Sequence, residues 1–245
     1  MAINNIFLHN KLTRKTSKNL TKLLISLIVI FFLAPFSSSV IGYSLMTILF
    51  LIINLLIVNL LYLPKIGKFT LRTLAVLASF FDLSYANQVH NLTQIMFLTN
   101  LFYAIFIILA IISLGSLIFK EKKVDINIVN GGISIFLLLA FLWFNFYTII
   151  LAFDPTAFKG LSAESEQQYQ LFYYSYVTIT TVGYGDITPV NKLAMGLANA
   201  QGIVGLMYPA IFIARLVSLY TTQDEEIFEF KIHPAKFKIL EIKLN

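Results

Sequence analysis

The sequence predicts an all-α membrane protein with six transmembrane helices, one re-entrant half-helix and an irregular loop after it. Hydrophobic residues make up 58% of the 245 residues, and charged residues only 12%. A water-soluble domain of this length could not be so apolar without exposing large hydrophobic patches. The apolar residues also gather in runs long enough to cross a bilayer.

The basic residues are distributed as in a membrane protein. Five of the 18 lysines and arginines precede the first apolar run, and the first 22 residues contain no acid. These residues are Lys11, Arg14, Lys15, Lys18 and Lys22. This positive-inside flank predicts a cytoplasmic N-terminus, and it favours membrane lipid over nucleic acid as the partner of the net charge of +6. A signal peptide is a rival interpretation, because the run Leu23–Phe36 has only 14 residues.

Six apolar segments are expected to cross the membrane. Their approximate bounds are Thr21–Ser38, Ser44–Leu63, Thr73–Gln88, Ile95–Phe119, Gly131–Phe153 and Asn191–Tyr220. The third is the weakest, because it is short and carries Asp82. However, the basic clusters at 65–72 and 120–123 both belong inside, so an even number of crossings must separate them. The third segment must therefore cross, and both termini are expected to be cytoplasmic.

An irregular stretch, residues 178–189, lies between the last two of these segments. Its Gly183-Tyr184-Gly185 sequence disfavours both helix and strand, because glycine loses the most backbone freedom on ordering. Irregular backbone at membrane depth is tolerated only where it is buried in protein or lines water. Inward-pointing carbonyls could there replace the hydration shell of a cation. The preceding Gln167–Thr180 is expected to be a half-length helix whose negative C-terminal end favours a cation nearby.

Residues 181–186, Thr-Val-Gly-Tyr-Gly-Asp, resemble the selectivity filter of the potassium channel family, pore-loop class. We refer to them as the filter segment. The resemblance implies K⁺ coordination by the carbonyls of Thr181, Val182, Gly183 and Tyr184 and by the Thr181 hydroxyl. It also implies that Gly185 opens the filter to the outside. Its remaining support residues would be Asp186 behind the filter, with Thr178, Thr180, Tyr173 and Tyr174.

The same resemblance, to prokaryotic six-span channels with one pore domain, implies the organisation of the chain. We expect a basic N-terminal segment (1–22), a four-helix domain (23–124), a pore domain (125–221) and a short cytoplasmic tail (222–245). The assembly would be a homotetramer in the cell membrane, with no cofactor other than the permeant K⁺. In the tail, the alternation at Phe228–Ile232 predicts a short strand.

Two departures from the family bear on how the protein is controlled. Val177 stands where some members carry a glutamate that partners the filter aspartate. The fourth span, Ile95–Phe119, has no arginine, lysine or histidine, so a steep response to voltage is not expected. Asp82 then lacks a basic partner, and we expect it to be neutral and hydrogen-bonded to a neighbouring helix. An intramembrane acid can also be functional, and that alternative stays open.

Other features allow two interpretations. Gly205 and Pro209 in the last span are expected to bend it, either as a moving hinge for a gate or as a static kink. The acidic loop at 154–166 either concentrates cations at an outer mouth or is simply solvated. Arg215 is expected to extend to the lipid interface.

Three other classes of function compete with a channel. Potassium transporters with related pore loops carry four such units in one chain, and this sequence contains one. An intramembrane enzyme is disfavoured, because the spans contain no paired carboxylates and no serine–histidine set. A regulatory subunit that does not conduct by itself is the third alternative.

Overall fold

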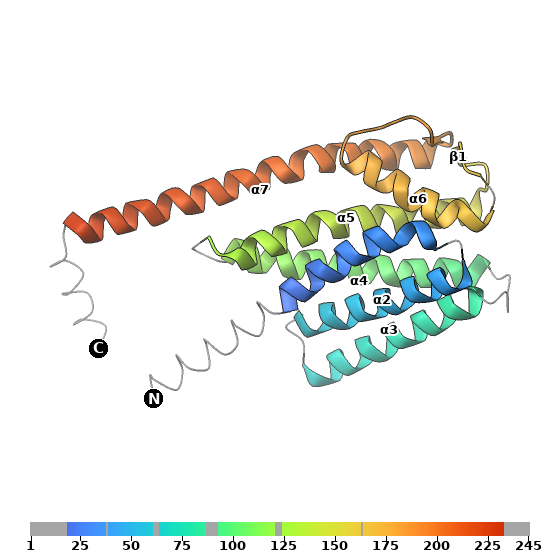
Figure 1. Ribbon diagram of the computed structural model, residues 1–245, viewed down its shortest axis with the longest axis horizontal. Coiled ribbons are helices and arrows are strands. Elements are labelled where there is room, and N and C mark those ends of the chain that lie inside the picture. Colours follow the sequence, from blue (N-terminus) through green and yellow to red (C-terminus); the bar gives the residue numbers. More distant parts are fainter. Residues whose placement is uncertain are drawn as a thin grey trace.

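The computed structural model describes residues 19–37, 39–60, 64–86, 93–120, 124–162 and 164–232. These parts form a bundle of long helices that run along a common direction (Figure 1). A helix over residues 19–33 is followed by the short 3-10 helix η1 (Ala34–Phe36). The other helices are α2 (Val40–Leu60), α3 (Lys65–Ala86), α4 (Thr93–Lys120), α5 (Ile126–Phe153), α6 (Glu164–Ile179) and α7 (Lys192–Ile232).

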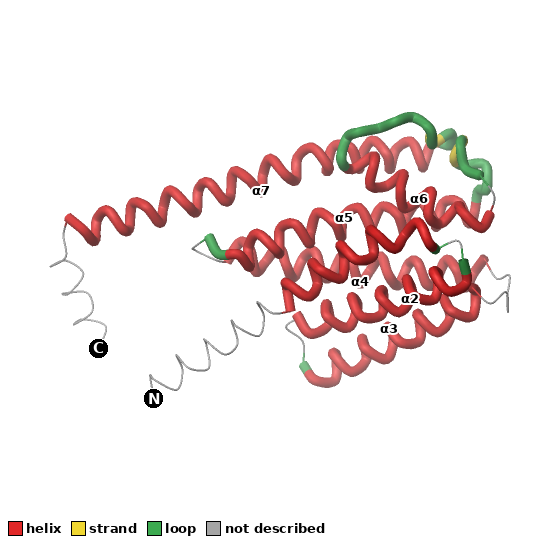
Figure 2. Tube along the Cα trace, in the orientation of Figure 1, coloured by secondary structure: helices red, strands yellow, loops and turns green. Residues whose placement is uncertain are grey.

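Strand content is minimal among the described residues. The two-residue strands β1 (Phe158–Lys159) and β2 (Thr188–Pro189) pair antiparallel, with Phe158 opposite Pro189. They lie in the loops around α6, at one end of the bundle (Figures 1 and 2). The all-helical fold class is therefore confirmed.

Five described helices are long and apolar enough to cross a membrane. They are Asn19–Phe36, Ile41–Asn59, Phe97–Lys120, Ile126–Phe153 and Lys192–Thr221. The third expected span corresponds to α3, which is not among them, because basic residues occupy its first two turns. Its 22 residues nevertheless extend about 33 Å, which is about the thickness of a bilayer core. Five of the six expected spans are thus supported, and the third stays a prediction.

The helices alternate in direction, so the two basic clusters lie at the same end of the bundle. The start of α3, with Lys65 and Lys68, and the end of α4, with Lys120, are both at the left in Figure 1. The basic residues at 11–18 and 121–123 lie outside the described residues. η1, β1 and β2 lie at the opposite end. The charge argument requires the basic start of α3 and the basic end of α4 to lie on the same side of the membrane. The direction of the helices agrees with this requirement.

Helix α5 is the centre of the bundle. Its Phe141 ring contacts Phe50 of α2 at 4.7 Å between centroids and Phe172 of α6 at 5.3 Å. Only residues 121–125 separate α4 from α5, so the two helices form an antiparallel hairpin. The four-helix domain consequently packs against α5 and α6 of its own chain.

Helix α7 corrects one expectation. It continues to Ile232, so the strand expected at Phe228–Ile232 is wrong. Alternation of apolar and charged residues over only five positions is weak evidence for a strand. Between Pro209 and Ile232, α7 contains no glycine or proline that would end the helix. The helix is also unbroken at Gly205 and at Pro209, the two positions where a bend was expected.

Candidate functional site

The filter segment follows the end of α6 in an unusual backbone conformation. Thr181, Gly183 and Gly185 have φ values of +62°, +56° and +81°. In an ordinary extended chain, successive carbonyls point to opposite sides of the backbone. Left-handed residues at every second position depart from such a chain, and where they alternate with right-handed residues the carbonyls can all point toward one side. Glycine adopts such values freely, whereas at Thr181 they cost about 1–2 kcal/mol.

Hydrogen bonds from the end of α6 hold this strained start in place. The Val177 carbonyl accepts the backbone N–H groups of Val182 at 3.1 Å and Gly183 at 3.3 Å. The Thr178 carbonyl accepts the N–H of Thr181 at 3.0 Å. Backbone strain persists only where surrounding contacts impose it, and these three bonds supply that constraint. The backbone of Val177 therefore supports the filter segment, although its side chain is not the glutamate that some members of the family carry at this position.

The predicted support residues have different contacts. The hydroxyls of Thr178 and Thr180 donate back to the carbonyls of α6, at 2.8 Å and 2.7 Å. The Tyr173 ring stacks on that of Tyr184, with 6.5 Å between centroids, and its hydroxyl lies near Asp186. These contacts place three of the expected residues against the filter segment or at the helix end that carries it.

Tyr174 differs from its neighbour. Its ring packs against Tyr147 of α5 at 5.0 Å and against Phe158 of β1 at 5.5 Å. Consecutive helical residues point about 100° apart, so Tyr173 and Tyr174 cannot both face the filter segment. The contacts of Tyr174 anchor α6 to α5 instead.

A buried polar network behind α6 was not predicted. The Tyr147 hydroxyl of α5 donates to Oε1 of Gln201 in α7 at 2.6 Å. Nε2 of Gln201 donates to the carbonyl of Ser175 at 2.9 Å and to its Oγ at 2.8 Å. The Ser175 hydroxyl then donates to the Ala140 carbonyl at 2.7 Å. The network thus ties α6 to both α5 and α7, and a glutamine within an apolar span was the sequence signal for it.

Gly205 lies where α7 crosses the end of α6. A Cβ atom at this position would approach the Ile179 carbonyl oxygen to 2.0 Å. Only glycine permits this contact, so the structure gives Gly205 a packing role. The contact does not test whether Gly205 is also a hinge.

The loop that follows α5 closes the site at the β1–β2 end. Asp154, at the end of α5, accepts hydrogen bonds from the Thr156 hydroxyl, from the Asn191 amide at 2.8 Å and from the Thr156 N–H at 3.0 Å. These hydrogen bonds lower the pKa of Asp154 below its ordinary value, and the bond from the Thr156 hydroxyl has the largest effect. Their stabilisation is present at neutral pH and is lost as the pH falls through the lowered pKa. For this acid of the loop, a structural role is therefore established.

Comparison with known proteins agrees with this site. Residues 133–222, from α5 to α7, match a family model described as "Ion channel". The chain is also 29% identical over 127 residues to "Two pore potassium channel a" of Oryza sativa subsp. japonica. The aligned residues make up 52% of this chain and 34% of the relative. The chain thus spans about a third of the length of that relative. No solved structure gave a significant match.

The matched span is similar to ion channels, and this similarity favours a channel over an enzyme. The relative is a potassium channel by its name, which agrees with the resemblance of the filter segment to the potassium channel family.

Loss of the Tyr147 hydroxyl should destabilise the packing of α5, α6 and α7. Tyr147→Phe leaves the buried Gln201 Oε1 without its donor, and we expect the free energy of unfolding to fall by about 1–3 kcal/mol. The loss in Tyr147→Phe/Gln201→Leu should be smaller than the sum of the two single losses, because both remove the same bond. Denaturant unfolding in detergent measures these values. Tyr208→Phe, which removes a hydroxyl bonded to Gly132, is the control and should be additive with Gln201→Leu.

Proposed function

We propose that the protein is a potassium-selective channel that conducts K⁺ passively across the cell membrane. The observation that carries the proposal is the left-handed φ at Thr181, Gly183 and Gly185 in a Thr-Val-Gly-Tyr-Gly sequence. With this backbone, the carbonyls of Thr181, Val182, Gly183 and Tyr184 would face one path. There they would replace the hydration shell of K⁺, and the Thr181 hydroxyl would add a ligand at the inner end.

One chain contributes one filter segment, so a closed cage of carbonyls requires several chains around a common axis. We therefore propose a homotetramer with four-fold symmetry. Exposed side chains support further contacts at this face: Val182 is 52% exposed and Tyr184 is 71% exposed in the single chain. Large apolar side chains of α7 are exposed as well, which fits contact with other copies or with lipid. They include Leu193, Ile203, Leu206, Met207 and Ile211.

The end of the bundle with the basic residues is proposed to be cytoplasmic, in accord with the positive-inside rule. Helix α3 would then be the sixth span. Its exposed apolar side chains suit contact with lipid tails, and they are Ile66, Phe69, Leu74, Val76, Leu77, Phe80 and Phe81. In this orientation both termini lie in the cytoplasm and the β1–β2 end faces outside.

Purified protein in liposomes should pass K⁺ and reject Na⁺. Gly183→Ala should nearly abolish this flux, because alanine at φ +56° costs about 1–2 kcal/mol in every subunit. No atom lies within 4 Å of the added methyl group in the single chain, so strain is the expected cause there. Gly115→Ala on α4 is the matched control, because its Cβ also meets no neighbour, and its flux should be normal.

Two results would contradict the proposal. Equal permeation of Na⁺ and K⁺ through the wild type would exclude selectivity, and normal selective flux through Gly183→Ala would remove the filter segment from the mechanism. If the assembly is folded but passes no ions, the alternative that the protein is a regulatory subunit would be favoured.

The assembly should contain four copies. Native mass spectrometry of protein in nanodiscs should give a protein mass of four times the 27.8 kDa of one chain. A stable, conducting dimer would be incompatible with the proposed filter.

Open probability should change little with voltage. Moving one charge through the whole membrane field is worth about 2.3 kcal/mol per 100 mV, and steep gating needs several such charges in each subunit. Lys120, the last residue of α4, is the only basic residue of that helix. Planar-bilayer recordings between about −100 and +100 mV, a range that spans about 4.6 kcal/mol per charge, provide the measurement. A steep sigmoid with an effective valence of several charges would show that the four-helix domain senses voltage.

A further inference from the structure

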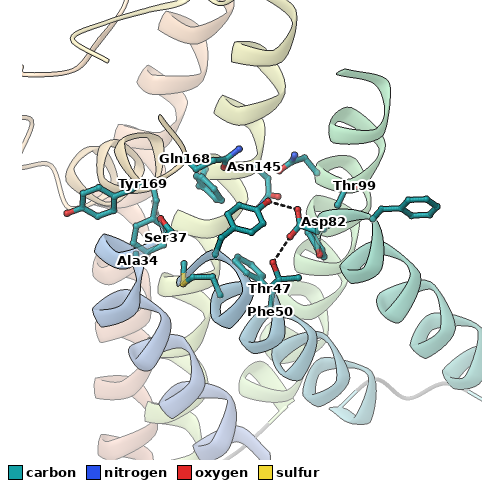
Figure 3. Close-up of a pocket in the computed structure, with 16 residues that line it drawn as sticks. Ala34, Ser37, Thr47, Phe50, Asp82, Thr99, Asn145, Gln168 and Tyr169 are labelled. Atoms are coloured by element: carbon teal, nitrogen blue, oxygen red, sulfur yellow. Dashed lines mark hydrogen bonds between the residues drawn. The ribbon is translucent and has the colours of Figure 1, made fainter. Parts of the chain in front are cut away.

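A cavity of about 70 Å³ lies between the four-helix domain and α6 (Figure 3). Its walls come from η1, α2, α3, α4, α5 and α6, in the half of the bundle that is nearer the β1–β2 end. One water molecule needs roughly 10–15 Å³ of such space, so the cavity has room for a group of several heavy atoms. No part of the proposed conduction path uses it.

Asp82 is the charged residue of this cavity among the described residues. The Tyr43 hydroxyl donates to its Oδ1 at 2.8 Å, and the Thr47 hydroxyl donates to its Oδ2 at 3.1 Å (Figure 3). The hydrogen bond to a helix neighbour, expected from the sequence, is confirmed and comes from α2. One donor on each oxygen is the arrangement that suits an ionised carboxylate, which has only acceptors.

The described lining lacks a positive charge to match. It includes no lysine, arginine or histidine, and its other titratable groups are Tyr43 of α2, Tyr103 of α4 and Tyr169 of α6. Asp82 is partly buried, and a carboxylate among membrane helices without a counter-charge is costly, a cost that is relieved when a cation pairs with it. The cavity therefore has the charge and the space to take a cation from outside the chain.

The walls indicate which kind of cation fits. Seven of the 16 lining residues are aromatic, namely Tyr43, Phe50, Phe81, Tyr103, Phe144, Tyr169 and Phe172. Aromatic faces attract cations, and organic ammonium groups are the ligands that aromatic walls recognise best. Ca²⁺ and Mg²⁺ prefer several oxygen ligands that include carboxylates, whereas the described lining has one carboxylate, Asp82, and each of its oxygens already accepts a hydroxyl.

We propose that this cavity binds a small organic ammonium group, with Asp82 as its counter-charge. The group could belong to a free amine or to the headgroup of a membrane lipid, since both present the same chemistry. Asp82 would then be ionised, in contrast to the neutral form expected from the sequence. A bound group would also contact Gln168, Tyr169 and Phe172 of α6, the helix that carries the filter segment.

Thermal unfolding in nanodiscs of phosphatidylglycerol, which has no amine, tests binding without relying on conduction. Methylammonium chloride should raise the unfolding midpoint of the wild type above that in NaCl or KCl of equal ionic strength. Asp82→Asn should abolish this rise, and Asp154→Asn, which changes a carboxylate outside the cavity, should retain it. Thr99→Leu fills the cavity but keeps the carboxylate, and it should also abolish the rise.

A second arm identifies the source of the group. If a lipid supplies it, nanodiscs of phosphatidylethanolamine should raise the midpoint of the wild type more than that of Asp82→Asn, and added methylammonium should have no further effect. If a free amine supplies it, the two lipids should give equal midpoints without methylammonium. Equal responses of the wild type, Asp82→Asn and Thr99→Leu in both arms would overturn the proposal. A rise of the same size in KCl or NaCl would overturn it too, because it would assign an inorganic cation.

Discussion

The structure depends on one constraint, which is that irregular backbone between membrane helices must be supported by protein or must face water. The filter segment meets this constraint through the end of α6. Two of its N–H groups share the Val177 carbonyl and a third bonds to Thr178, so the start of the segment is held by the helix that precedes it. The strain at Thr181, about 1–2 kcal/mol, is comparable to the net value of one or two such bonds. The filter segment therefore keeps its conformation only if α6 is fixed in place. Most of the packing around α6 helps to fix it.

Helix α6 is fixed from three directions. Ser175 and the Tyr176 hydroxyl bond to carbonyls of α5, and Gln201 joins the same region from α7. The third direction is the first helix, whose Phe31 ring lies 5.3 Å from that of Tyr176. Each hydrogen bond contributes only about 1 kcal/mol net, but a buried polar group left without its partner costs about 1–3 kcal/mol. The network consequently fixes the register of α6 more strongly than its net stabilisation indicates.

Local patterns allowed the sequence to predict the helices and the filter segment, because hydropathy and a six-residue motif depend on neighbours along the chain. Contacts between distant residues could not be predicted in this way. Gln201 needs Ser175 and Tyr147, and nothing in a single sequence pairs them. Gly205 suggested a hinge because of its residue type, while its contact with Ile179 depends on how α7 crosses α6. The strand predicted in the tail was wrong for the opposite reason, because a local pattern of five residues was given more weight than the helix that continues through it.

The short connection at 121–125 also determines where the four-helix domain can act. Because α4 folds back directly onto α5, this domain contacts the α6 of its own chain through aromatic rings, which include Phe31 and Phe172 at 6.2 Å. Its contact with α7 includes an exposed hydrogen bond from Arg215 to the Phe119 carbonyl at 3.2 Å, so this arginine contacts α4, and its extension to the lipid interface stays a prediction. An exposed hydrogen bond contributes about 1 kcal/mol or less, whereas a buried aromatic ring such as that of Phe172, which is 4% exposed, contributes about 1.5–3 kcal/mol. A change in the four-helix domain should therefore reach the filter segment through α6 more readily than it reaches the inner end of α7.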